Sequence, residues 1–215
     1  MLDAIGHFLD ATAFSAFSAP VSNAELIGFV AGAGCVWLAA RQNPLNFPLA
    51  LLNALTFGLL FVDKKLYGDA GLQAMFFALN LHGWWRWWRG DGEHHPLLVS
   101  RLSTRGWIVV GAALVVCVPA LRQALIAISG AAPFLDALIT TLSVVAQVLL
   151  NRKILENWWL WIVVDLISIP LYVSKTLYLT ALLYAAFLLM CVGALSAWRH
   201  SLRHTEPVQP SGCPS

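Results

Sequence analysis

The feature that most constrains the fold is an apolar stretch, Ile154 to Lys175, that carries an ionisable residue near its middle. A helix needs about 20 apolar residues to cross a bilayer, and this stretch is long enough. Asp165 then lies at membrane depth, where a carboxylate costs about 2.5–3.5 kcal/mol on insertion scales, so its presence indicates a function. Asn157 and Trp161 precede Asp165 at a spacing of four residues, on the same helical face. Such a face suits a flat, polar solute better than it suits lipid.

The composition indicates a polytopic membrane protein. Of the 215 residues, 59% are hydrophobic and 11% are charged, whereas soluble domains are about 25% charged. The net charge is +2 and no basic run is present, which argues against nucleic acid as a partner. The four cysteines form no CxxC pair, and the three that lie in apolar spans are interpreted as packing residues. No metal or cofactor is expected, because Glu93, His94 and His95 are interpreted as a solvated turn.

Seven apolar spans follow one another along the chain. We expect helices at about residues 26–40, 44–62, 66–88, 107–128, 134–150, 154–173 and 177–198. Pro119 and Arg122 interrupt the fourth span. The leader, residues 1–25, lacks the basic n-region of a secretory signal and is expected to be short and amphipathic or loose. The polar tail, residues 199–215, is expected to be disordered.

The positions of lysine and arginine predict that the N-terminus lies outside and the C-terminus in the cytoplasm. In that orientation most basic residues lie inside, as the positive-inside rule requires. The inside set is Arg41, Arg86, Arg89, Arg101, Arg105, Arg152, Lys153, Arg199 and Arg203, and the outside set is Lys64, Lys65, Arg122 and Lys175.

The first three spans resemble the last three. In one ungapped register, Arg41 falls on Arg152 and Asn46 on Asn157. In the same register the matched pairs include Phe47 with Trp158 and Trp87 with Trp198. We therefore predict an all-α integral membrane protein with seven transmembrane helices in a parallel 3+1+3 repeat, as in SWEET transporters, with its solute site at the repeat interface. Its parts would be two three-helix bundles, residues 26–88 and 134–198, joined by a loop and a linker helix, residues 89–133.

Polar and aromatic side chains from several spans are predicted to face a common axis. Amides offer both donors and acceptors, so they can hydrogen-bond a ribose or a carboxamide. Indoles stack on flat rings and favour cationic ones by about 0.5–2 kcal/mol. The candidate substrate-binding residues are Asn53, Gln73, Phe77, Asn80, Trp84, Gln147, Asn157, Trp161, Asp165 and Tyr184.

Structural alternatives stand beside these assignments. An intramembrane Asn or Gln can instead join two helices, at about 0.6 kcal/mol on average. The tryptophans between Trp84 and Trp88 are typical of an interface anchor, with Trp84 the exception that could reach the site. Asp165 can pair with a lysine, cap a neighbouring helix or couple transport to protons. A binding subunit that needs an energy-coupling partner stays open, whereas an intramembrane enzyme is disfavoured because no acid–base pair or metal set is visible.

Two runs resemble a known family. The run Glu156 to Phe187, ENWWLWIVVDLISIPLYVSKTLYLTALLYAAF, is similar to the signature region of PnuC-type nicotinamide riboside transporters. The run Leu66 to Trp87, LYGDAGLQAMFFALNLHGWWRW, is similar to its partner. The resemblance implies a SWEET-like 3+1+3 fold, often a homotrimer, in the bacterial inner membrane. It also implies facilitated diffusion of a vitamin-type solute, made one-way by a cytoplasmic kinase that phosphorylates the solute.

The resemblance also suggests roles for individual residues. Asn157 and Trp161 match the family's W-N-x-x-x-W motif, but Glu156 stands where its first tryptophan would be. Related members carry thiamine, riboflavin or deoxynucleosides, so these stay alternatives to nicotinamide riboside. In the expected scheme Trp161, with Phe77 or Trp84, stacks on the base. The amides expected to hydrogen-bond the sugar or carboxamide are Gln73, Asn80, Gln147 and Asn157.

Overall fold

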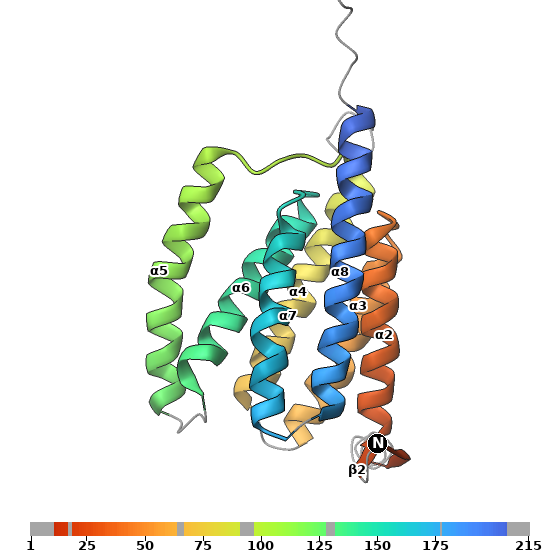
Figure 1. Ribbon diagram of the computed structural model, residues 1–215, viewed down its shortest axis with the longest axis vertical. Coiled ribbons are helices and arrows are strands. Elements are labelled where there is room, and N and C mark those ends of the chain that lie inside the picture. The colour runs from red at the N-terminus through yellow and green to blue at the C-terminus, as the bar shows by residue number, and fades with distance from the viewer. Residues whose placement is uncertain are drawn as a thin grey trace, which may run out of the picture.

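A bundle of long helices makes up the chain (Figure 1), in a computed structural model that describes residues 11–16, 19–63, 67–90, 97–127, 132–176 and 178–205. Two short strands, β1 (Thr12–Ala16) and β2 (Ala19–Ser22), precede the helices. The helices of the described residues are α2 (Asn23–Ala40), α3 (Asn46–Asp63), α4 (Tyr67–Arg89), α5 (Thr104–Ala127), α6 (Pro133–Asn151), α7 (Asn157–Ser174) and α8 (Tyr178–Thr205).

The predicted all-α membrane fold is confirmed, and each predicted span contains one helix. By length and hydropathy, α3, α5, α6, α7 and α8 can each cross a membrane, and α2 contains a shorter apolar helix, Leu26–Ala40. The helix α4 ends in Arg86 and Arg89, which lower its hydropathy. The predicted interruption at Pro119 is wrong, because α5 continues through it. Proline is tolerated inside membrane helices, where the freed carbonyl can find another partner.

The structure differs from the prediction in both the leader and the tail. The described part of the leader is an antiparallel hairpin in which Thr12 pairs with Ser22, and not a loose segment. The predicted tail begins as helix, because α8 continues beyond Trp198 to Thr205. This extension is held by a hydrogen bond of 2.9 Å from Gln42 Nε2 to Ser201 Oγ. The rest of the leader and tail, and the expected turn at Glu93, lie outside the described residues.

Six of the helices form two groups of three, and the groups meet at two pairs of packed helices. Within each group, neighbours in sequence are neighbours in space: α2 with α3 and α3 with α4, then α6 with α7 and α7 with α8. Between the groups, α2 packs on α8 and α4 packs on α6. The helix α5 packs on α6 and lies at the edge of the bundle (Figure 1). The third helix of each group therefore packs on the first helix of the other.

The turn between α2 and α3 has the same construction as the turn between α6 and α7. Gln42 and Lys153 both have positive φ, 56° and 51°. The Asn46 amide then donates to the Asn43 carbonyl at 2.8 Å, and the Asn157 amide donates to the Ile154 carbonyl at 2.7 Å. Residues that are matched in the sequence register therefore also share their backbone geometry and their side-chain hydrogen bonds.

Four buried aromatic rings close the core at the end of the bundle where these turns lie. Phe47 meets Trp87 edge-to-face at 5.1 Å, Trp158 meets Trp198 in the same way at 5.4 Å, and the centroids of Trp87 and Trp198 are 6.2 Å apart. The Trp198 indole donates to the Ala39 carbonyl at 3.0 Å, while that of Trp87 donates to a carbonyl of α6 at 3.3 Å. These hydrogen bonds join the third helix of each group to the first helix of the other.

The interpretation of Trp87 as part of an interface anchor is therefore wrong. Trp87 is 8% exposed, whereas its neighbour Trp88 is 84% exposed. The two side chains differ because α4 turns one toward the core and the other away from it. Lys153 lies against the Trp87 ring, with Nζ 4.5 Å from its centroid, and burial lowers the pKa of this lysine.

An extended strap, residues 97–103, leads across the same end of the bundle into α5 (Figure 1). Its Ser100 donates to the Lys153 carbonyl at 3.0 Å and accepts from the Leu155 N–H at 2.9 Å. The Leu102 N–H donates to the Glu156 carboxylate at 2.8 Å. The strap is therefore fixed to the turn before α7.

Candidate solute-binding site

The polar face predicted on α7 is buried inside the bundle. Asn157 is fully buried, Asp165 is 3% exposed and Ser168 is 1% exposed. Trp161 is half-buried and packs against two clusters of buried apolar residues, one that includes Trp158 and one that includes Leu160. The helical spacing that suggested this face in the sequence therefore places it toward protein and away from lipid.

Several polar atoms on this face lack partners among the described residues. Asp165 Oδ2, Ser168 Oγ and Asn157 Oδ1 are buried without a hydrogen bond in that part of the chain. The Cys191 thiol of α8 lies close to the Asp165 side chain. A buried polar group left unsatisfied costs about 1–3 kcal/mol, so such groups are normally satisfied by water or a bound molecule. Asp165 and Ser168 lie one turn apart and can serve one solute.

A second polar group joins α4 to α6. Gln147 Nε2 donates to Asn80 Oδ1 and to Asn151 Oδ1, each at 3.0 Å. The Asn151 amide donates in turn to the Leu79 carbonyl at 2.7 Å. Gly83 permits this approach, because a Cβ there would overlap the Asn151 amide and the Phe47 ring. The structure thus brings Asn80 and Gln147 together, in a network that both joins helices and holds amides in a fixed orientation.

A third group lies among α2, α3, α7 and α8. Tyr184 stacks on Tyr172 with centroids 5.1 Å apart and meets Phe187 edge-to-face at 6.2 Å. Asn53 donates to the Gly28 carbonyl at 3.0 Å. A Cβ added at Gly32 would lie 3.4 Å from the Asn53 amide and 3.2 Å from the Phe187 ring, so these side chains meet at one surface of α2.

The predicted stripe on α4 is divided between the interior and the outer face. Asn80 is buried and Gln73 is half-buried against α3, where its Cβ lies near Gly58. Phe77 and Trp84 are 37% and 38% exposed. Trp84 lines an apolar hollow of about 770 Å³ on the outer face, together with Ala78, Leu81, His82, Trp85 and Trp88. Phe77 and Trp84 are therefore not gathered with the buried amides in this conformation.

Asn157 lies apart from the mid-bundle groups. Its amide closes the turn before α7, close to the aromatic rings that include Trp158. The neighbouring Glu156 accepts a hydrogen bond from the strap. The residue that departs from the family motif thus contributes to holding the strap, which accounts for a carboxylate at this position.

Ser168 and Asn151 also line these groups, and their helical spacing from Asp165 and Gln147 indicates this in the sequence. Cys191 and Phe187 had no such signal, because an apolar residue on α8 looks the same whether it packs or faces a solute. Among the described residues no group of three His, Cys, Asp or Glu could hold a metal ion.

The chain is similar in sequence and in structure to membrane transporters of vitamins and related compounds. The profile of the nicotinamide mononucleotide transporter family matches residues 22–200. The chain is 28% identical to the nicotinamide riboside transporter PnuC of Escherichia coli K12, over 83% of this chain and 86% of that protein. It is 30% identical to the riboflavin/roseoflavin transporter RibM of Streptomyces davaonensis, over 94% of this chain and 97% of that protein. A crystal structure of the vitamin B3 transporter PnuC is similar with a TM-score of 0.67 and 25% identity, over 84% of this chain and 82% of that chain.

Proposed function

This chain belongs to the nicotinamide mononucleotide transporter family, and from that premise we propose that it imports nicotinamide riboside. Like its relatives, it is a multi-pass membrane transporter and not an enzyme. The observation that carries the choice of solute is the buried polar face of α7. Asp165 and Ser168 each offer a buried oxygen atom that has no hydrogen-bond partner in the described part of the chain. A pyridinium riboside brings both a positive charge and hydroxyl groups.

In the proposed complex the solute lies between the two helix groups. Trp161 stacks on the pyridinium ring, and the oriented amides Asn80 and Gln147 hydrogen-bond the ribose or the carboxamide. Asp165 balances the ring charge. Gln73, Asn53 and Tyr184 border the space from the neighbouring helices, while Phe77 and Trp84 would reach it only after α4 rotates. Asn157 acts from the turn before α7.

The proposed architecture is a parallel 3+1+3 repeat of the SWEET kind, with residues 26–88 and 134–198 as the repeats. Support comes from the matched turns at Gln42 and Lys153, and from the reciprocal hydrogen bonds of Trp87 and Trp198. The helix α5 would be the linker. Because the two groups meet mainly where α2 packs on α8 and where α4 packs on α6, they can rock against one another around a solute held between them.

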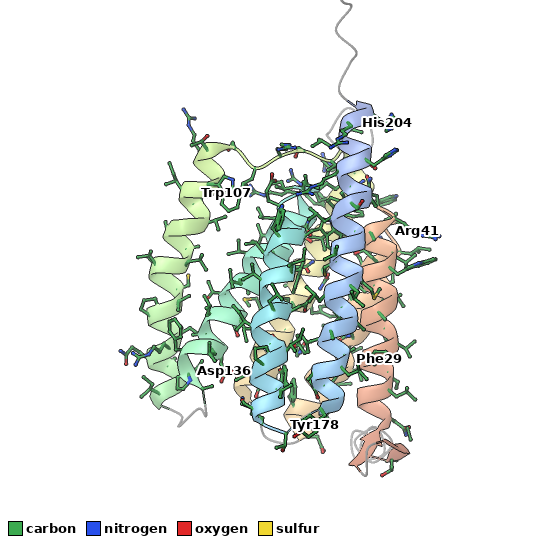
Figure 2. The ribbon with its side chains drawn as sticks, in the orientation of Figure 1. Phe29, Arg41, Trp107, Asp136, Tyr178 and His204 are labelled. Carbon is green, nitrogen blue, oxygen red and sulfur yellow. The ribbon has the colours of Figure 1, made fainter. Side chains whose placement is uncertain are left out.

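We further propose that the C-terminal end of α8 faces the bacterial cytoplasm. Arg41 and His204 lie at the same end of the bundle, and Tyr178 lies at the other (Figure 2). All residues of the predicted inside set belong to the connections or helix ends at the first of these ends. Transport is facilitated diffusion, and phosphorylation by a cytoplasmic kinase traps the solute. The outward apolar surfaces of α4 and α5 would join copies of the chain in a homotrimer.

Riboflavin is the second candidate solute. The observation that favours it is the similarity to RibM over nearly the whole of both chains. Both solutes are flat, ring-containing and hydroxylated, so the same stacking and amide groups would serve either. Only the pyridinium riboside carries the positive charge that Asp165 would balance.

Calorimetric titration of the purified protein in detergent tests the choice, with nicotinamide riboside, riboflavin and thiamine measured side by side. We expect nicotinamide riboside to bind with the highest affinity, and Asp165→Asn to weaken it more than it weakens riboflavin. Preferential binding of riboflavin by the unmodified chain would overturn the proposed solute and leave the fold and family intact.

A further inference from the structure

Arginine predominates among the described residues that line a hollow at the basic end of the bundle. The hollow has a volume of about 240 Å³, and these lining residues are Arg101, Arg199, Leu202 and Arg203. Among the described residues, no carboxylate forms an ion pair with any of the three guanidinium groups. Three like charges around one hollow repel one another, so the arrangement is stabilised when an anion occupies it.

The strap fixes the position of Arg101. Its neighbours on both sides are hydrogen-bonded to the turn before α7: Ser100 through two backbone bonds with Lys153 and Leu155, and Leu102 through the Glu156 carboxylate. The adjoining Val99 is 6% exposed and belongs to the apolar core. The backbone that presents Arg101 is therefore held in place before any ligand arrives.

The end of α8 supplies the other two arginines. Arg199 and Arg203 are four residues apart and project from one face of the helix. The preceding Trp198 is fully buried and hydrogen-bonded to α2, which fixes the rotation of this part of α8. The Arg199 guanidinium lies 5.2 Å from the Trp159 ring centroid. Stacking on a ring leaves the N–H edges of a guanidinium free to donate.

We propose that this hollow binds a phosphate group. Guanidinium groups donate paired hydrogen bonds to phosphate oxygens, and three of them satisfy a tetrahedral anion from several sides. A phosphate monoester in solution and the phosphodiester of a lipid headgroup offer the same chemistry. The site is separate from the solute face of α7, so its existence does not depend on which solute is carried.

The test uses the full chain, purified in a neutral detergent, and supplies phosphate from each source. Calorimetric titration with nicotinamide mononucleotide is compared with titration by nicotinamide riboside, which lacks the phosphate. In parallel, native mass spectrometry counts bound phosphatidylglycerol against phosphatidylcholine, which is the zwitterionic control. Phosphate-dependent binding of either anionic probe supports the site, and the arm that responds identifies the source. Absence of phosphate-dependent binding in both arms would overturn the proposal.

Matched double variants separate a built site from general attraction to the basic end. We expect R101Q/R203Q to weaken the responding probe roughly tenfold or more, since two charge-assisted contacts are lost. The control R105Q/R152Q removes two exposed arginines of the same end that do not line the hollow, and binding should change less than about twofold. Equal losses in the two variants would refute the site. R101K/R203K keeps both charges and serves as the conservative variant. Retained binding of nicotinamide riboside by each variant shows that its fold is intact.

Discussion

Gln147 lies between two other amide side chains, Asn80 and Asn151. It donates to two amides at once, and each of those amides donates onward to a backbone carbonyl of α4. Such a network can serve as helix contact, as solute contact or as both. The two roles predict different consequences for solute affinity, so they can be separated by measurement.

We expect Gln147→Ala to lower solute affinity roughly tenfold, because the oxygens of Asn80 and Asn151 lose a shared donor and the amides lose their orientation. Titration of detergent-purified protein measures the affinity, and a thermal melt measures stability. Gln123→Ala, at an exposed amide of α5, is the control and should change neither. A lower melting temperature with unchanged affinity would assign Gln147 to helix contact alone.

The tryptophans of α4 show how adjacent residues of one type take different roles. Trp87→Phe and Trp198→Phe should each destabilise the protein by about 1–3 kcal/mol, because a buried carbonyl loses its indole donor. Trp88→Phe should stay within about 0.5 kcal/mol, since Trp88 is 84% exposed. Thermal or denaturant unfolding in detergent gives these differences. Equal effects at Trp87 and Trp88 would contradict the reciprocal hydrogen bonds.

At the scale of the element, the packing of α4 on α6 depends on one glycine. A Cβ at Gly83 would overlap Asn151 and Phe47, whereas a Cβ at Gly71 of the same helix would meet nothing within 4 Å. Helix propensity favours alanine at both positions, so packing alone distinguishes them.

Gly83→Ala should therefore destabilise the protein by about 1–3 kcal/mol through overpacking, while Gly71→Ala should stabilise it by up to about 1 kcal/mol. Unfolding in detergent, followed by tryptophan fluorescence, compares the two. Stabilisation of both variants would contradict the close approach of α4 to α6 at Gly83.

At the scale of the whole molecule, the orientation can be read from two exposed residues at opposite ends. Arg105→Cys and Lys175→Cys, each in a background free of native cysteines, should react differently with a membrane-impermeant maleimide applied to intact cells. Only the Lys175→Cys variant should be labelled, because Arg105 lies at the end proposed to face the cytoplasm. Labelling of Arg105→Cys alone would invert the orientation.

The proposed mechanism predicts how transport ends. In liposomes without a kinase, internal nicotinamide riboside should rise to the external concentration and no further. An imposed pH gradient should leave the rate unchanged, because facilitated diffusion moves no proton with the solute. Accumulation above the external concentration under a pH gradient would instead make Asp165 the first residue to examine as a proton carrier.

The sequence determined the helices and much of the internal correspondence. Apolar length specifies a membrane helix almost without reference to the rest of the chain, since every backbone group must be satisfied within the segment. The spacing of Asn157, Trp161 and Asp165 likewise identified a face that is buried in the structure. Trp87 and Trp198, which are matched in the sequence, also occupy equivalent positions in the two helix groups, because two segments of similar sequence adopt similar local structures.

Only the tertiary structure decided how each face is used. Phe77, Asn80 and Trp84 lie close together on α4 by periodicity, yet Asn80 alone is buried, because the rotation of α4 is set by its contact with α6 at Gly83. The carboxylate of Glu156 holds the strap, and Arg101 meets Arg199 and Arg203 across a hollow. These pairings join segments far apart in the chain. Helical periodicity places residues on one face of a helix, but it contains no information about what the neighbouring helix places opposite them.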